Sequence, residues 1–462
     1  FRAYKDEHPV IRGGPALNGF EPYRDKIMQC DLKPLGLEGK AFRQLFFRGA
    51  RMPLARTPSL DPADLHGGVW AHVVEASPQG SKRSFTYNPK DLDPSRWARP
   101  TDGRIGVFCQ YDWRWNWLPL QAVSVDDKTL TLGRDATYEF GVGDRYFVEG
   151  ILEELDSPGE WYLDRQDWVV YFWPPEPIRD GDVSVPVVGD LVQFKDTRDV
   201  SLRGFVLEGC DGNAVRMENA ERCQVAQSVL RNCGAWGASI DGGAECSLVG
   251  CDVSATGCGG ILLGGGDRKT LAPAKHLAAN NVIHHVGVFE KTYNTAINIG
   301  GVGNVARNNL IYDTPHAGLT LAGNDNVVEL NVIHHTNLQS TDTGGLYSCP
   351  RDWTQRGNVI RHNVWHDLGG FGKRSSWEPV RDGKVEYEYP HFTWGIYMDD
   401  PTSGNTMYGN VLYRVPICGM FTHGGRDCVF ENNVIVDCPA FQAGMLWPGW
   451  DEWTNVYERF RA

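Results

Sequence analysis

The sequence of 462 residues predicts an all-β fold: a right-handed parallel β-helix, with an antiparallel β-domain inserted near its N-terminus. Three observations support this prediction. From about residue 200 a short motif recurs with a base period of 22 to 23 residues. Polar residues, mostly asparagine, stand at fixed places in the motif, and the segments between them alternate in polarity as strands do. Helical periodicity and the fixed leucine spacing of a leucine-rich repeat are both missing from this region.

Asparagines occupy two positions of the repeat. Each copy begins with a polar residue and two mostly apolar ones, and the clear copies start at Asn281, Asn309, Asn331, Asn363, Asn410 and Asn433. A second column stands five residues before each start, at Cys223, Cys246, His276, Asn304, Asn326, Asn358, Asn405 and Cys428. An asparagine repeated in consecutive coils can bond the backbone of its turn and stack on its neighbour, so we predict two asparagine ladders.

Aromatic and sulfur-containing side chains form columns as well. A stripe that recurs in every coil, and is therefore better explained as a structural stack than as a metal site, comprises His284, Tyr312, His334, His366 and Tyr413. A further column holds Cys210, Cys233 and Cys438. Small thiols suit stacked interior positions, and the twelve cysteines lack metal-finger spacing. We expect structural thiols, with disulfides between stacked neighbours left open.

The domain organisation follows from where the repeat begins and ends. We expect a first β-helix coil at 1–14, an inserted β-domain at 15–190, the β-helix with its site loops at 191–446, and a C-terminal segment at 447–462 that is cut short. The inserted part is rich in aromatic residues and reads as antiparallel strands. We assign its tryptophans Trp113, Trp115 and Trp117 to the core and the domain interface in preference to a platform that binds sugar. Both ends of the sequence read as cuts through a longer protein.

The composition restricts the function classes. A net charge of −13 disfavours nucleic-acid binding, which needs clustered lysine and arginine. No run of eighteen apolar residues is present, so we expect no membrane span. The 16 tryptophans offer flat rings that suit sugar faces. We therefore expect a secreted or periplasmic protein with an oligo- or polysaccharide substrate; its oligomeric state is left open.

The uneven repeat length predicts where that ligand binds. A β-helix fills its core with side chains, so a ligand lies in an outer groove walled by long turns. The widest spacing, 47 residues, separates Asn363 from Asn410. Polar residues gather around the same coils, in the motifs DTGGLY, RDW, YMDD and THGGRD.

Strand register assembles part of this set. Tyr397 and Asp399 lie two residues apart in GIYMDD, so they share one face of a strand. That face is the outer one if Ile396 and Met398 fill the core. In the same register, Tyr347 precedes Tyr397 by one coil and His423 follows Asp399 by one coil. The predicted outward patch therefore comprises Tyr347, Tyr397, Asp399 and His423. Asp342 can reach the same groove.

Two carboxyl groups across a cleft point to glycosidic hydrolysis, in which one protonates the leaving oxygen and the other attacks the sugar or activates water. We predict Asp342 and Asp399 as that pair, with Asp400 as a further catalytic candidate. The predicted substrate-binding residues are Tyr347, Arg351, Asp352, Tyr397, His423 and Arg426.

Two of these acidic residues also have a structural explanation. Asp352 can serve a turn, paired with Arg351 or Arg356, and Asp400 precedes Pro401 in a turn. We expect no cofactor and no metal in the catalytic role; a structural Ca²⁺ at Asp400 stays open.

The motifs DTGGLY, RDWTQRGN, GIYMDD and GGRD, with VIRGG and EWYLDRQDWVVYFWPP upstream, resemble bacterial right-handed parallel β-helix proteins of carbohydrate-degrading loci, closest to glycoside hydrolase family 141. The resemblance covers nearly the whole chain. It implies α-L-fucosidase-like or xylanase-like action on plant or algal cell-wall polysaccharide. It also implies the carboxylate pair Asp342 and Asp399. The long insertion between these two residues departs from the family and would reshape its subsites.

Two other functions stay open beside the hydrolase, which is the leading prediction. A polysaccharide lyase or epimerase would remove a uronic-acid proton with a basic side chain and neutralise the sugar carboxylate with arginine or Ca²⁺. Its parts would come from Arg351, Lys373, Tyr397 and His423. A non-catalytic carbohydrate-binding β-helix would need no close pair of outward carboxylates.

Overall fold

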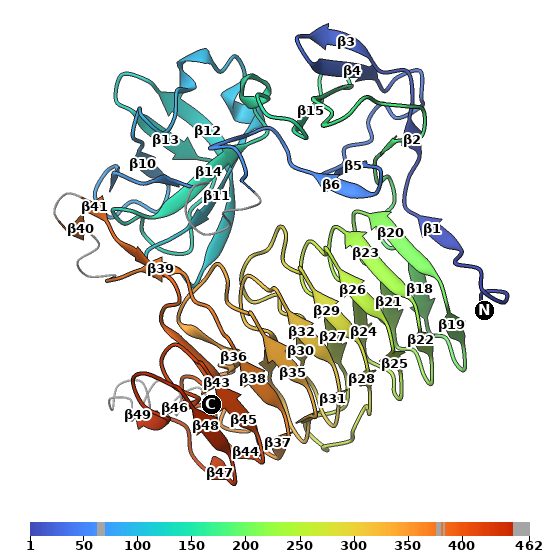
Figure 1. Ribbon diagram of the computed structural model, residues 1–462, viewed down its shortest axis with the longest axis vertical. Coiled ribbons are helices and arrows are strands. Elements are labelled where there is room, and N and C mark those ends of the chain that lie inside the picture. The colour runs from blue at the N-terminus through green and yellow to red at the C-terminus, as the bar shows by residue number, and fades with distance from the viewer. Residues whose placement is uncertain (62–69, 376–379, 382–383, 447–462) are drawn as a thin grey trace. The chain divides into compact units, whose positions relative to one another are not determined.

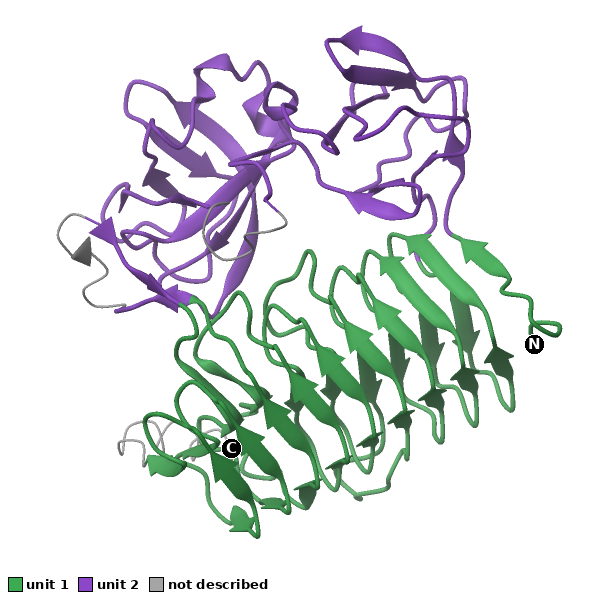
Figure 2. Cartoon of the chain, in the orientation of Figure 1, with its two compact units in different colours: residues 1–12, 190–371, 389–462 green, residues 13–189, 372–388 purple. Residues whose placement is uncertain are grey.

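The computed structural model describes residues 1–61, 70–375, 380–381 and 384–446 (Figure 1). They divide into two compact units (Figure 2). Unit 1 comprises Phe1–Arg12, Asp190–Phe371 and Tyr389–Ala462, and unit 2 comprises Gly13–Gly189 and Gly372–Glu388. The predicted C-terminal segment 447–462 lies outside the described residues. No helix in the described ranges has the length and apolarity that a membrane crossing requires.

Unit 1 is a β-helix built from three parallel sheets, which confirms the predicted fold class. The first sheet contains β1 (Val10–Arg12), β20 (Val206–Cys210), β23 (Val229–Cys233), β26 (Asp252–Ser254), β29 (Val282–His284), β32 (Leu310–Tyr312), β35 (Val332–His334), β38 (Val364–His366), β45 (Val411–Tyr413) and β48 (Val434–Val436). Its first strand, from the N-terminal residues, pairs in parallel with β20.

The second sheet carries the strands of the predicted site. It contains β18 (Val192–Lys195), β21 (Val215–Glu218), β24 (Ala238–Asp241), β27 (Ile261–Gly264), β30 (Ile297–Ile299), β33 (Leu319–Leu321), β36 (Thr343–Ser348), β43 (Thr393–Met398), β46 (Met420–His423) and β49 (Ala443–Leu446). The third sheet contains β19 (Ser201–Arg203), β22 (Gln224–Ala226), β25 (Ser247–Val249), β28 (Leu277–Ala279), β31 (Val305–Arg307), β34 (Val327–Glu329), β37 (Asn358–Arg361), β44 (Asn405–Tyr408) and β47 (Val429–Glu431).

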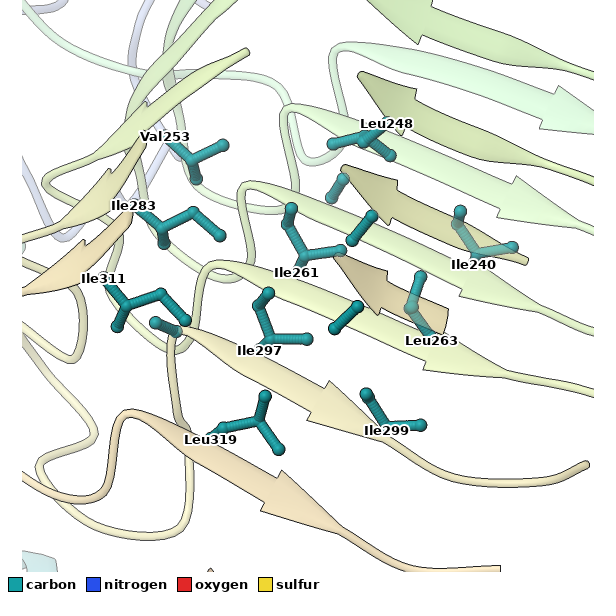
Figure 3. Packing of buried hydrophobic residues seen from close by; sticks show 14 of the residues in the cluster. Ile240, Leu248, Val253, Ile261, Leu263, Ile283, Ile297, Ile299, Ile311 and Leu319 are labelled. Carbon is teal, nitrogen blue, oxygen red and sulfur yellow. The ribbon is translucent and has the colours of Figure 1, made fainter. Parts of the chain in front are cut away.

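A continuous apolar core runs through the coils of unit 1. Ile261, Ile297 and Leu319 occupy the same register in three successive strands and are fully buried (Figure 3). Ile283 and Ile311 repeat this arrangement in the first sheet. Burying one such side chain contributes about 1.5–3 kcal/mol, so the stacked rows stabilise the solenoid along its length.

Both predicted asparagine ladders are confirmed. The side-chain oxygen of Asn309 accepts hydrogen bonds from the backbone N–H and the side-chain amide of Asn281, at 3.0 and 2.9 Å. Each following asparagine of this column repeats the pattern. In the second column the Asn304 N–H donates to the Asn326 side chain at 2.8 Å, while the Asn304 side-chain amide donates to the Gly300 carbonyl at 2.7 Å. These bonds satisfy buried polar groups at the turns and fix the register of the coils.

The predicted ring column is a stack. Consecutive rings of His284, Tyr312, His334, His366 and Tyr413 lie 4.9, 5.3, 4.9 and 4.9 Å apart, nearly parallel. Thiols complete the second asparagine column where asparagine is missing: Cys223 and Cys246 are buried and free. The Cys246 thiol donates to the Ala220 carbonyl at 3.1 Å, as a structural thiol does.

Unit 2 contains the antiparallel sheets predicted for the inserted domain. The largest comprises β7 (Arg56–Thr57), β14 (Arg145–Glu149), β11 (Arg104–Phe108), β12 (Trp115–Ser124), β13 (Thr129–Leu132), β10 (Ser84–Thr86) and β9 (Glu75–Ala76), with β8 (Ala71–His72) paired to β14. Two smaller sheets comprise β15 (Trp161–Asp164), β16 (Val169–Phe172), β4 (Ile27–Asp31) and β3 (Glu21–Arg24), and β2 (Ala16–Leu17), β17 (Val183–Ser184), β5 (Leu45–Phe47) and β6 (Ala50–Met52). Short 3₁₀ turns are η1 (Pro94–Arg96), η2 (Pro100–Asp102) and η3 (Leu152–Glu154). Of the three tryptophans assigned to core and interface, Trp115 is buried among aromatic rings, whereas Trp113 and Trp117 are half-buried.

The long insertion of the β-helix belongs in part to unit 2. Its residues Gly372–Glu388 include the strand pairs β39 (Gly372–Lys373) with β42 (Tyr387–Glu388) and β40 (Val380–Arg381) with β41 (Lys384–Val385). Lys373 forms a buried ion pair with Asp144, and its backbone N–H donates to Asp112 at 2.9 Å. The Tyr387 hydroxyl donates to the Gly143 carbonyl at 2.6 Å. These bonds explain why the segment groups with unit 2 although the sequence assigns it to the β-helix loops.

Candidate active site

Three neighbouring strands of the second sheet carry the candidate site: β36, β43 and β46. Tyr347 pairs with Tyr397 in register, and the ladder continues to Asp399, whose N–H donates to the Ser348 carbonyl at 2.8 Å. Ile396 and Met398 lie in the apolar core, as predicted. The side chains that alternate with them therefore leave the coil on its outer face.

Aromatic side chains cover part of that outer face. Tyr347 and Tyr397 are only 7% and 4% exposed, and they pack with Trp394 and Phe421 in a separate aromatic cluster. The Trp394 ring lies 4.3 Å from that of Tyr397, and the Phe421 ring 5.5 Å. The tyrosine rings are therefore buried, and their hydroxyl groups are what reach the site.

Asp399 is surrounded by hydrogen-bond donors. The Tyr347 hydroxyl donates to Oδ2 at 2.6 Å, and His423 Nδ1 lies 2.9 Å from Oδ1. The backbone N–H of Asp400 donates to the same Oδ1 at 2.8 Å, and Tyr397 adds a side-chain bond. Burial alone would raise the pKa of Asp399, but these bonds outweigh it and lower that pKa. Asp399 is therefore held as a carboxylate.

Asp342 has the opposite environment. It precedes β36, in a left-handed conformation with a φ of 50°, and its backbone N–H donates to the Phe392 carbonyl at 2.8 Å. Within the described ranges no group donates a hydrogen bond to its carboxyl. Burial, and next the negative charge of Asp399, raise the pKa of Asp342 to about 7. Near neutral pH this carboxyl holds its proton for much of the time.

Asp400 forms an ion pair beside these two residues. The Arg351 Nε donates to Asp400 Oδ2 at 2.6 Å, and His423 Nδ1 lies 3.9 Å from Asp400 Oδ1. Ligand atoms of Cys349, Asp399 and Asp400 lie within 4.8 Å of one another. The structural Ca²⁺ considered for Asp400 stays a prediction, at a carboxylate that already pairs with a guanidinium.

Two other predicted site residues have local partners instead. Asp352 pairs with Arg268 at 2.6 Å, and accepts bonds from the backbone and hydroxyl of Thr354 at 2.8 and 2.7 Å. Its partner is therefore neither Arg351 nor Arg356. Arg426 pairs with the exposed Asp427 at 3.2 Å. No hydrogen bond or ion pair in the described part of the chain joins Asp352 or Arg426 to Asp342 or Asp399, and the substrate-binding role of both stays a prediction.

Aromatic residues around the pair escaped the sequence prediction. Trp394 and Phe421 cover the tyrosines, and Phe392 contacts the Asp342 backbone. Phe421 takes the position of Tyr397 one coil later, so the register that predicts the position of His423 also predicts that of Phe421. Phe392 lies in the irregular part of the insertion, where no repeat position identifies it.

Comparison with known proteins addresses the fold. The family described as right-handed β-helix region matches residues 190–372 and 295–446. No curated protein matches the chain at a significant level. Among solved structures, one described as a glycoside hydrolase shares 16% identity, with a TM-score of 0.69, over 93% of this chain and 83% of that chain.

Two more distant structures complete the comparison. The complex of XylC with xylose shares 8% identity at a TM-score of 0.43, over 94% of this chain and 76% of that one. The mannuronan C-5 epimerase AlgE4 A-module of Azotobacter vinelandii shares 12% at 0.35, over 55% and 65%. Of the three, the glycoside hydrolase at a TM-score of 0.69 and 16% identity shows a shared fold, and the fold alone. Since the family match spans more than half of the sequence, the chain belongs to the right-handed β-helix family.

Proposed function

We propose that the protein is a glycoside hydrolase in which Asp342 is the general acid and Asp399 is the ionised partner. The observation that carries the proposal is the opposite shift of two neighbouring pKa values: that of Asp342 is raised to about 7, and that of Asp399 is lowered. Carboxyl pairs whose environments separate their pKa values in this way suit acid and base roles at one pH.

The reaction assigns each residue one task. Asp342 would give its proton to the glycosidic oxygen as the bond to the leaving sugar breaks. Asp399 would either attack the anomeric carbon or take a proton from the attacking water. Tyr347 and His423 would keep Asp399 charged and oriented through their hydrogen bonds.

Several observations favour hydrolysis over a lyase or epimerase reaction. Lys373, a candidate base, is buried in an ion pair within unit 2. Burial, followed by the charge of Asp399, raises the pKa of both Tyr347 and Tyr397 well above the usual value, so neither tyrosine suits a base. Arg351, the candidate partner for a sugar carboxylate, is bound to Asp400.

The charge balance supports a neutral substrate. A uronic acid would bring its carboxylate beside those of Asp399 and Asp400, and the neighbouring Arg351 is already bound to Asp400. We therefore propose a neutral cell-wall polysaccharide, with fucose or xylose units as the resemblance to glycoside hydrolase family 141 suggests. The fold shared with a glycoside hydrolase is consistent with this choice.

The test is product analysis with the variants Asp342→Asn and Asp399→Asn. We expect sugar release from neutral plant or algal polysaccharides to fall about 10²–10⁴-fold in each. Asp342→Asn should melt no lower than the native protein at pH 8, because a neutral amide replaces a buried carboxyl whose pKa is raised. Asp427→Asn, at an exposed turn residue, is the matched control and should keep full activity. Full activity in both site variants, or an unsaturated product that absorbs near-ultraviolet light, would contradict the proposal.

A further inference from the structure

Phe392 combines an unusual backbone conformation with an exposed ring. Its φ is 41°, in the left-handed region that bulky side chains rarely adopt, and its side chain is 41% exposed. Such a conformation persists where the surrounding structure imposes it, and in this chain it also occurs at turns of the β-helix such as those at Asn280 and Leu330.

The backbone of Phe392 is joined to the proposed general acid. Its carbonyl accepts the Asp342 N–H at 2.8 Å, and Asp342 is itself left-handed with a φ of 50°. Two residues in this uncommon conformation therefore hold each other through one hydrogen bond. The bond therefore fixes the position of the Phe392 Cα atom, from which the ring projects, relative to the Cα atom of Asp342.

The Phe392 ring packs against neighbouring aromatic rings of the protein. It meets the Trp394 ring edge-to-face, with centroids 4.8 Å apart and an interplanar angle of 68°. Trp394 in turn packs on Tyr397, which bonds to Asp399. His391 lies 5.9 Å from the Phe392 ring. A chain of ring contacts thus connects the exposed Phe392 to the second proposed carboxylate.

We propose that Phe392 is the stacking platform of a sugar subsite next to Asp342, and that it binds the C–H face of an uncharged pyranose or related ring. An exposed aromatic ring attracts the apolar face of a sugar without needing a charge, which fits a site already rich in carboxylates. The subsite serves the proposed hydrolase reaction and so rests on that proposed function. It adds a binding residue that neither the repeat pattern nor the carboxylate pair identifies.

The experiment measures binding and turnover separately. In the Asp399→Asn background, which can bind without hydrolysing, Phe392→Ala should weaken the affinity for a neutral substrate oligosaccharide about tenfold by calorimetry, whereas Phe392→Trp should restore it. In the otherwise native protein, Phe392→Ala should raise KM by a similar factor and change kcat less. Tyr23→Ala removes an aromatic side chain of similar exposure, 43%, from unit 2 and should change neither affinity nor KM.

The outcomes separate this subsite from the proposed function. If Asp342→Asn and Asp399→Asn abolish hydrolysis but Phe392→Ala leaves affinity and KM unchanged, the subsite is refuted and the hydrolase stands. If Phe392→Ala lowers only kcat, and Phe392→Trp does not restore it, Phe392 merely supports the Asp342 backbone, which also refutes the subsite. Full activity of both aspartate variants overturns Asp342 and Asp399 as the catalytic pair, and the KM of Phe392→Ala in the otherwise native protein then tests whether Phe392 binds sugar.

Discussion

Tyr347 donates its hydroxyl hydrogen to Oδ2 of Asp399 at 2.6 Å, from the preceding coil of the β-helix. His423, from the following coil, contacts the other carboxylate oxygen. Asp399 is thus held from both sides by residues whose spacing is the spacing of the coils. The repeat that builds the fold therefore also sets the electrostatics of the candidate site.

Replacing Tyr347 with phenylalanine removes one of these donors without changing the packing of the ring. Because the donor favours the charged form of Asp399, we expect the pKa of Asp399 to rise. The low-pH side of the activity profile should then move to higher pH, and kcat/KM at the optimum should fall about tenfold. Tyr312→Phe, in the ring stack of the first sheet, is the matched control. An unchanged low-pH side would show that Tyr347 does not influence the reacting carboxylate.

The pH profile of the native enzyme provides a second prediction. Asp342 must be protonated to act as the acid, and its pKa of about 7 means that kcat/KM should decline as the pH rises through about 7. Asp399 must be ionised, and its lowered pKa places the opposite decline at a lower pH than an ordinary aspartate would. The profile should be measured on a neutral oligosaccharide. Activity that stays constant up to pH 9 would exclude Asp342 as the proton donor.

The register of the site could be predicted from the sequence because strands alternate and coils repeat. Those two periodicities predict that Tyr347 lies beside Tyr397 and that His423 follows Asp399 by one coil, as the structure shows. The partner of Asp352 could not be predicted, because Arg268 lies in a turn outside the repeat. The packing of other aromatic rings over Tyr347 and Tyr397 could not be predicted either. The alternation of a strand indicates to which face a side chain points, but not which residues cover it.

The asparagine ladder makes a prediction about stability. Asn331 donates to the Ala306 carbonyl at 3.1 Å and to the Asn363 side chain at 2.9 Å, while its own oxygen accepts from Asn309. Asn331→Leu would leave several buried groups without partners, each costing about 1–3 kcal/mol. Chemical denaturation should therefore show a loss of about 3 kcal/mol or more. Val434→Ala, at an exposed position of the first sheet, should cost far less; equal losses would mean that the ladder is not a special source of stability.

Lys373 allows a test that separates a structural lysine from a catalytic base. Its ammonium group and the carboxylate of Asp144 are only 2% and 0% exposed. Breaking a buried ion pair from one side leaves an uncompensated charge and typically costs about 3–5 kcal/mol. We therefore expect Lys373→Met to destabilise unit 2 by about this amount in denaturation followed by tryptophan fluorescence. Lys384→Met, at an exposed lysine of the same inserted segment, should leave the stability unchanged.

The double variant Lys373→Met/Asp144→Asn makes the test independent of folding. Removing both charges eliminates the buried unpaired carboxylate, so much of the lost stability should return. The folded double variant should then hydrolyse its substrate nearly as well as the native enzyme, because Lys373 takes no part in the proposed chemistry. A stable double variant with no turnover would instead identify Lys373 as a reacting group and favour the lyase mechanism, in which a basic side chain removes a proton from the sugar.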